Sequence, residues 1–166
     1  MMSETDVSRT EGGELTTAAI LSIFRANGLL LAAGDVLAGE QGLTSARWQV
    51  LGAINEADRP LTVPQIARRM GLTRQSVHTS VKRLVTDGLV ELAPNEDHKR
   101  SPLLDLTDRG RETLAAIEAK QATWVNQLAA GLTRSQLQAT VQVLSDLCGR
   151  LERSRNQTDN PEGGQA

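Results

Sequence analysis

The sequence predicts a mainly α-helical protein that carries one small β-hairpin. Apolar residues recur at helical spacing in several segments of the 166-residue chain, and a threonine able to cap a helix precedes most of these segments. Two short apolar stretches flank a polar loop, which is the pattern of a hairpin. The aromatic residues are only Phe24, Trp48 and Trp124, so we expect an aliphatic core.

Composition narrows the class of protein. The single cysteine, Cys148, excludes an internal disulfide and a cysteine-rich zinc site, and it favours a cytoplasmic location. Residues 1–13 and 154–166 are polar, and we expect them to be disordered tails. The acidic start differs from a signal peptide. No unbroken apolar run approaches the roughly 18 residues of a membrane-spanning helix, so we expect no contact with a membrane.

A long helix is predicted over residues 14–38, where apolar side chains are dense. Gly28 and Gly34 interrupt it, and each costs about 1 kcal/mol relative to Ala inside a helix. Close approach of another backbone is one explanation for such glycines. Gly39 and Gly42 then bracket a loop.

Three shorter helices are predicted to follow. The first begins after Thr44 and the second after Thr62, and Gly71 ends the second as a C-terminal glycine does. Thr73, two residues after Gly71, caps the third. Two helices joined by a short turn that contains glycine form a helix-turn-helix.

The third of these helices is predicted to present a cationic face. Val77, Val81 and Leu84 take its inward positions, and residues 64–86 contain five Lys or Arg and no acidic residue. In a helix-turn-helix this helix enters the major groove of DNA, where Arg can bond guanine and Gln can bond adenine. We assign base contacts to Arg74, Gln75, His78 and Thr79, and phosphate contacts to Thr73, Ser76 and Lys82.

A hairpin is predicted next, with strands over residues 89–92 and 103–106. The polar loop between them, residues 93–102, is too long for a tight turn and should project from the domain. Lys99 and Arg100 lie at its tip. A cation in this place can enter the minor groove, where narrow A·T tracts concentrate negative potential.

Two further helices complete the chain. Thr107 caps one that extends to about residue 130, and Gly131 breaks it. A capping box of Thr133 and Gln136 begins the last helix. Its apolar residues follow a narrow heptad-like stripe that is typical of a helix–helix seam, and they are Leu137, Val141, Leu144, Cys148 and Leu151.

From Leu43 to Gly110 the chain resembles the MarR (multiple antibiotic resistance regulator) family. The resemblance rests on the segments LTSARWQVLGAI, LTVPQIARRMGLTRQSVHTSVKRLVTDGLVE and NEDHKRSPLLDLTDRG. In the last of these, Lys99-Arg100 precedes the pattern Leu-x-Leu-Thr-x-x-Gly, which is fairly specific. The flanking helices also match in order and length, so the resemblance covers about residues 15–151.

The resemblance implies a winged helix-turn-helix DNA-binding domain over residues 43–106, and a helical dimerisation region made of residues 14–42 and 107–153. Such a homodimer binds a pseudo-palindromic site on double-stranded DNA, with half-sites about 34–36 Å apart. Members are commonly repressors that are released by a small-molecule effector, often a phenolic or other anionic compound, or by cysteine oxidation. The resemblance implies neither a cofactor nor a metal.

The wing departs from the family pattern. Leu92 and Ala93 occupy the stretch where the family often has a basic residue, just after the first strand. His98 stands where an acidic residue usually braces the wing arginine, and Asp97 lies one position away. We expect Pro102 to stiffen the returning strand instead.

Two other classes of function fit the sequence less well than a regulator does. A winged helix that binds protein would present exposed apolar residues on the face where this chain carries polar and cationic ones. An enzyme would need a catalytic constellation, and the sequence contains none. His78 and His98 lack the thiol or carboxylate neighbours of a metal site.

Two residues have both a structural and a functional interpretation. For Cys148, a buried structural thiol is favoured over a redox sensor, because it lies on the apolar stripe of the last helix. For Trp48, a place in the core is favoured over the lining of an effector pocket.

Overall fold

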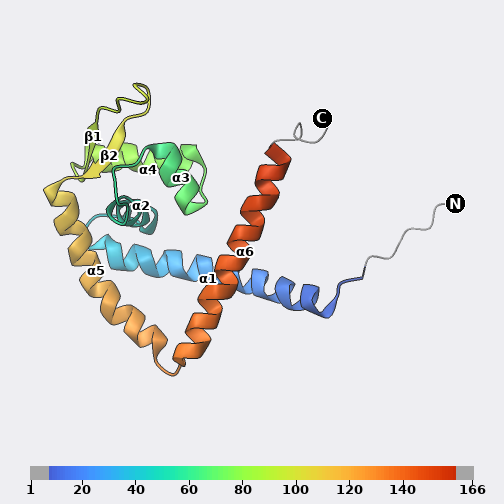
Figure 1. The fold of residues 1–166 in the computed structure, drawn as a ribbon. Helices are drawn as coiled ribbons and strands as arrows, with labels where there is room; N and C mark the ends of the chain where they lie inside the picture. The colour runs from blue at the N-terminus through green and yellow to red at the C-terminus, as the bar shows by residue number, and fades with distance from the viewer. Residues whose placement is uncertain (1–7, 160–166) are drawn as a thin grey trace, which may run out of the picture. The chain divides into compact units, whose positions relative to one another are not determined.

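The computed structural model describes residues 8–159, which form a mainly helical chain with one antiparallel hairpin (Figure 1). This confirms the predicted fold class. The chain divides into two compact units, residues 1–122 and 123–166, and helix α5 contributes to both. The elements are α1 (Glu11–Gly39), α2 (Ser45–Asn55), α3 (Val63–Met70), α4 (Arg74–Thr86), β1 (Val90–Ala93), β2 (Leu103–Leu106), α5 (Asp108–Ala129) and α6 (Arg134–Asp159).

Helix α1 begins at Glu11, three residues before the predicted start. The hydroxyl of Thr10 accepts a hydrogen bond from Gly13 N at 3.1 Å and caps the helix. Residues 11–13, which we expected in a disordered tail, are therefore helical. Most apolar side chains of α1 are exposed on the single chain, Phe24 at 69% and Val36 at 77%.

The apolar character of α1 differs from the sequence-based expectation. The helix is long and apolar enough to cross a membrane, with a mean hydropathy of 1.5 over an 18-residue window. The expectation considered only unbroken apolar runs, whereas α1 reaches this value although Arg25 interrupts its apolar residues. Length and composition do not distinguish a membrane helix from one that packs against another protein helix.

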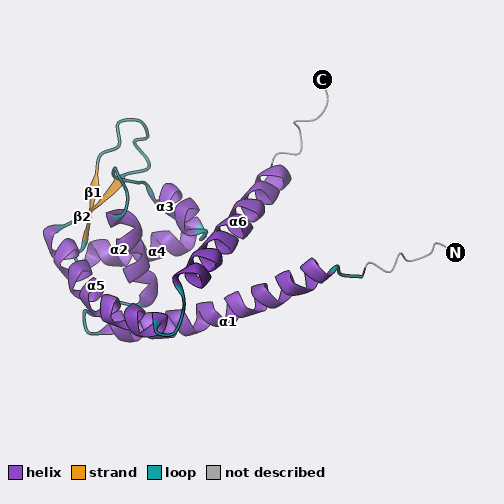
Figure 2. Cartoon of the chain, turned by 60° about the horizontal axis from the view of Figure 1, so that its bottom comes forward, coloured by secondary structure: helices purple, strands orange, loops and turns teal. Residues whose placement is uncertain are grey.

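The core of the first unit is aliphatic, as predicted. Helices α2, α3 and α4 and the hairpin surround this core, which lies at one end of α1 (Figure 2). Its largest fully buried side chains are Leu51, Ile66, Leu84, Leu104, Leu106, Ile117, Val50 and Val77. Gly71 ends α3 with a φ of 66°, a left-handed conformation that suits glycine, and α4 begins three residues later.

The hairpin pairs Val90 with Leu106 and Ala93 with Leu103, so its first strand lies one residue later than predicted. Leu104 N also donates a hydrogen bond to Leu61 O at 2.9 Å, which ties the hairpin to the segment before α3. The loop of residues 94–102 projects beyond the sheet (Figure 1).

The second unit contains the end of α5 and all of α6. The predicted capping box is present, because Thr133 N donates to Gln136 Oε1 at 2.9 Å and Gln136 N donates to Thr133 Oγ1 at 3.3 Å. Helix α6 continues to Asp159, so residues 154–159 are helical, contrary to the prediction of a tail from residue 154. This stretch contains neither Gly nor Pro to end the helix. Residues 160–166 lie outside the described part.

The apolar stripe of α6 is exposed on the single chain. Leu151 is 70% exposed and Val141 is 68% exposed. Cys148 is also exposed, so the prediction of a buried thiol is wrong for the isolated chain. The spacing of the stripe correctly indicated an apolar helix face, but spacing alone does not show what covers that face.

Candidate nucleic-acid interface

Helix α4 has the amphipathic arrangement that the sequence predicted. Val77, Val81 and Leu84 are buried in the core. The opposite face is open to solvent, and every residue assigned to DNA contact on this helix is exposed, namely Thr73, Arg74, Gln75, Ser76, His78, Thr79 and Lys82. The packing of three aliphatic side chains therefore determines which side chains the helix presents.

Two hydroxyl groups on α4 are already engaged in local hydrogen bonds. Thr73 Oγ1 accepts from Ser76 N at 3.1 Å and caps the helix, which leaves its own proton free to donate to a phosphate. Thr79 Oγ1 donates to Gln75 O at 3.0 Å. The hydroxyl proton of Thr79 is therefore engaged, whereas its methyl group and its oxygen lone pairs remain available.

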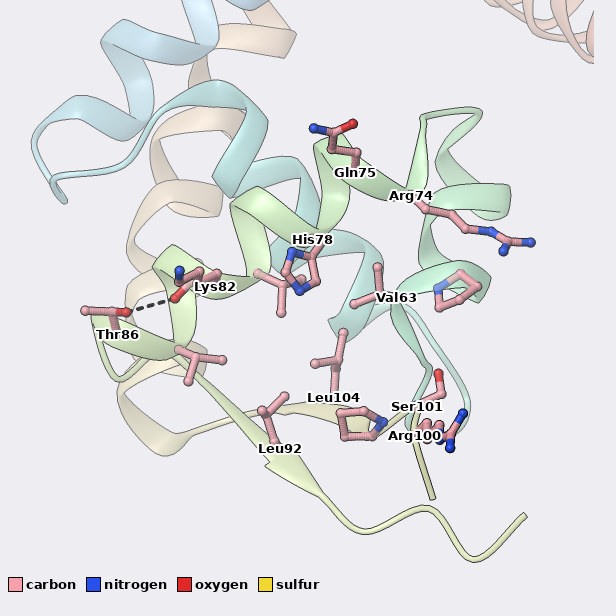
Figure 3. Close-up of a pocket in the computed structure, with 14 residues that line it drawn as sticks. Val63, Arg74, Gln75, His78, Lys82, Thr86, Leu92, Arg100, Ser101 and Leu104 are labelled. Carbon is pink, nitrogen blue, oxygen red and sulfur yellow. Dashed lines mark hydrogen bonds between the residues drawn. The ribbon is translucent and has the colours of Figure 1, made fainter. Parts of the chain in front are cut away.

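A groove of about 760 Å³ lies between α4 and the hairpin (Figure 3). Arg74, Gln75, His78, Lys82 and Arg100 line it. Four of the residues of the α4 segment that the sequence assigned to DNA contact therefore share one groove with Arg100, one of the two wing cations. Within the described residues, no Asp or Glu contributes to this lining. The groove therefore carries positive charge without compensation from its own walls.

The floor and far wall of the groove are apolar, which the sequence did not predict. Figure 3 shows His78 of α4 facing this wall, where Leu92 and Leu104 of the strands lie. Leu92 is 52% exposed, at the position where the family often has a basic residue. Thr73, Ser76, Thr79 and Lys99 are not among the lining residues, and all four are exposed.

Asn95 braces the wing in place of the expected acidic residue. Its Nδ2 donates to Ser101 O at 2.8 Å, and its Oδ1 accepts from Asp97 N at 3.1 Å and from His98 N at 3.3 Å. One amide side chain thus joins the two ends of the loop that carries Arg100. The signal in the sequence was an Asn at the start of a polar loop, because Asn side chains form local turns of this kind.

A network of charges supports the far end of α4. Asp87 Oδ2 lies 3.2 Å from Arg47 NH1 and 3.2 Å from Arg83 Nε. Arg47 also donates to Gly42 O at 3.1 Å, and Arg109 donates to Asp87 O at 3.1 Å. The carboxylate of Asp87 therefore connects α2 with the end of α4, and its backbone carbonyl connects the end of α4 with the start of α5.

Trp48 lies where the favoured interpretation placed it, against the core. It is half-buried and packs against the core, and it also lines a second cavity of about 400 Å³ with residues of α2, α3 and α5. Half of its ten lining residues are polar, namely Gln49, Glu56, Arg69, Glu118 and Gln121. Within residues 8–159, no three His, Cys, Asp or Glu side chains form a group able to hold a metal ion.

Comparison with known proteins decides the family. Residues 41–101 match the MarR family model. An uncharacterized protein of Mycobacterium tuberculosis is 46% identical over 121 residues, which is 73% of this chain and 83% of that protein. The chain belongs to the MarR family. The transcriptional activatory protein BadR of Rhodopseudomonas palustris is 29% identical over 100 residues, covering 59% of this chain and 57% of BadR.

Solved MarR structures share the fold. Staphylococcus aureus MarR in complex with salicylate and kanamycin aligns with a TM-score of 0.69 at 18% identity, covering 84% of this chain and 94% of that one. The protein therefore has the winged-helix fold of MarR-family transcription regulators, which is what the family model and these solved structures describe.

Proposed function

We propose that this MarR-family protein is a cytoplasmic homodimer that binds a pseudo-palindromic operator on double-stranded DNA and represses transcription until an effector releases it. The groove between α4 and the hairpin carries the proposal, because Arg74, Lys82 and Arg100 line it and no described carboxylate does. Such a surface suits a polyanion such as the phosphate backbone of DNA.

The contacts with DNA divide between the helix and the wing. Arg74, Gln75, His78 and Thr79 face base edges in the major groove, and Thr73, Ser76 and Lys82 contact the flanking phosphates. Lys99 and Arg100 enter the adjacent minor groove. The sugar–phosphate backbone between the two grooves of DNA then passes along the groove of the protein, against Leu92.

A second copy of the chain is the proposed cover for the exposed apolar faces of α1 and α6. Side chains such as Phe24, Val36, Val141 and Leu151 are each more than half exposed on the single chain. Isolated soluble chains rarely expose so much contiguous apolar surface. This pairing also explains why α1 has the composition of a membrane helix.

The effector is proposed to be a small organic molecule that enters the cavity beside Trp48. Salicylate in the S. aureus MarR complex provides a precedent in the family for a small aromatic ligand. Glu56, Glu118 and Arg69 at this cavity give it mixed charge, so compounds with both an aromatic ring and a polar group are the first to screen.

Fluorescence anisotropy tests the regulator. The probe is promoter DNA adjacent to the protein's own gene, titrated in a salt series against a random duplex of equal length. We expect tight binding that outcompetes random DNA, with a steep negative salt slope. Weak binding that is equal on all duplexes, including fragments selected from the whole genome, would contradict sequence-specific regulation.

A matched pair of arginine variants tests the site. Arg74→Ala removes a groove cation and should weaken binding by about 10- to 100-fold and relax base preference at one position per half-site. Arg69→Ala removes the same charge from α3 outside the groove and should leave the base preference unchanged. An unaltered preference profile for Arg74→Ala would exclude Arg74 from base contact.

A further inference from the structure

Helix α1 joins the rest of the first unit through its last turns. Within this helix, whose residues are all described, Gly34 and Ala38 alone are buried. Figure 1 shows this end of α1 beside α2. Between the two helices the chain makes a tight turn, in which Leu43 N donates to Ala38 O at 3.2 Å and Leu43 is buried.

Gly34 permits an unusually close approach of the two helices. A Cβ built on Gly34 would lie 2.4 Å from Ser45 Oγ and 2.9 Å from Ser45 Cβ. An ordinary contact between carbon atoms needs about 3.5 Å. The hydroxyl could rotate away, but the Ser45 Cβ is fixed to the backbone. Any side chain at residue 34 therefore pushes α1 and α2 apart by roughly half an ångström.

Asp35 adds a polar contact at the same point. Its Oδ1 accepts from Ser45 N at 2.6 Å. Ser45 is the first residue of α2 and is only 2% exposed, so its N–H has neither a partner within its own helix nor water. Thr44 caps the helix by accepting from Arg47 N instead. The carboxylate of α1 thus completes the N-terminal cap of α2.

Helix α2 in turn belongs to the core that holds α4. Leu51 and Ile54 of α2 are buried in one cluster with Val77, Val81 and Leu84 of α4. A change in the angle between α1 and α2 therefore moves α4 relative to the exposed apolar part of α1. In the proposed dimer, that part of α1 contacts the partner.

We propose that Gly34 and Asp35 are positioning residues that set which operator spacing the dimer accepts. This inference rests on the proposed function. Half-sites one turn of DNA apart are about 34–36 Å apart, and each added base pair shifts one half-site by about 3.4 Å and rotates it by about 35°. The close packing at Gly34 and the hydrogen bond from Ser45 N to Asp35 hold the two recognition helices at one such separation. Looser packing between α1 and α2 would let the two helices adopt several separations.

Operators with altered spacing test the inference. Wild-type protein is first used to select its operator from genomic fragments, and the two half-sites are then separated by two fewer to two more base pairs. The wild type should lose about tenfold in affinity per base pair of change. Gly34→Ala and Asp35→Ala should reduce this loss to less than about threefold and keep the base preference within each half-site.

Two variants serve as controls. Gly39→Ala lies in the same helix with no atom within 4 Å of the added Cβ, so it should keep the wild-type spacing profile. The double variant Gly34→Ala with Ser45→Gly removes the atoms that the new methyl group would meet, and it should restore the profile. If Asp35→Ala folds poorly, Asp35→Asn takes its place in the comparison. It retains an acceptor without adding bulk, so it should keep the wild-type spacing profile.

The outcomes separate this inference from the proposed function. A wild-type protein that selects no operator would overturn both. An operator that is bound specifically but equally at every spacing would overturn the inference alone. Three results with the variants would also overturn the inference alone. Gly34→Ala and Asp35→Ala could keep the steep wild-type spacing profile, or they could lose base preference within the half-site. The double variant could fail to restore the wild-type profile.

Discussion

Replacement of Gly110 by Ala should destabilise the protein through one collision. Gly110 lies in the first turn of α5 and is buried. A Cβ there would lie 2.1 Å from Leu89 O and 3.0 Å from Leu89 C, both backbone atoms that cannot rotate away. The start of α5 must therefore move by about 1 Å from the segment that joins α4 to β1, since a carbon atom in contact with a carbonyl oxygen lies about 3.3 Å from it.

The magnitude follows from the contacts at this point. Overpacking costs about 1–3 kcal/mol. The shift also strains the hydrogen bonds from Thr107 N to Leu89 O at 3.2 Å and from Thr107 Oγ1 to Gly88 O at 2.8 Å, each worth about 1 kcal/mol. Ala regains somewhat less than about 1 kcal/mol of helix propensity. We expect a net loss of about 2–4 kcal/mol in the free energy of unfolding.

Urea unfolding monitored by circular dichroism measures this loss. All variants are compared at one protein concentration, because the stability of a dimer depends on it. Gly52→Ala is the matched control, since it lies inside α2 with no atom within 4 Å of the added methyl group and should stabilise by up to about 1 kcal/mol. A Gly110→Ala protein as stable as Gly52→Ala would refute the steric argument.

The remaining predictions concern the wing, the charge network and the proposed dimer. Asn95→Ala should weaken DNA binding by about 3- to 10-fold in the anisotropy assay while stability changes by less than about 0.5 kcal/mol, because it frees an exposed loop; unchanged affinity would show that the brace is dispensable. Arg100→Ala should lower the preference for A·T flanks, and a wild-type protein that is indifferent to its flanks would already contradict this. Asp87→Ala should lower the free energy of unfolding in urea by about 1–2 kcal/mol, because two arginines share its half-buried carboxylate. The control Glu56→Ala removes an exposed ion pair and should change stability by less than about 0.5 kcal/mol. Equal effects of the two variants would argue against the network. Removal of residues 133–166 should yield a monomer in sedimentation velocity, and a truncated dimer would exclude α6 from the interface.

Local signals allowed the fold to be predicted from the sequence. Thr73 and the spacing of Val77, Val81 and Leu84 define both the start of α4 and its buried face, because capping and helical periodicity act within a few residues. Gly71 likewise predicted the end of α3. The exposed placement of Arg74 and its neighbours follows from the same periodicity, while their contacts with DNA stay predictions.

Features that depend on distant residues were beyond the sequence. The sequence suggests a close approach at Gly34, but nothing in the sequence identifies Ser45 as its neighbour. Cys148 shows a different limit, because a heptad stripe indicates an apolar helix face without indicating whether the same chain covers it.

The sparse aromatic content gives the protein a built-in optical reporter. The chain has two tryptophans and no tyrosine. Trp48 is half-buried, lines the smaller cavity, and places its ring 3.5 Å from where a Cβ on Gly34 would lie. Trp48→Phe would leave Trp124 as the background signal. The difference in emission would then report on the surroundings of one indole, so that ligand entry and helix rearrangement could be followed in unlabelled protein.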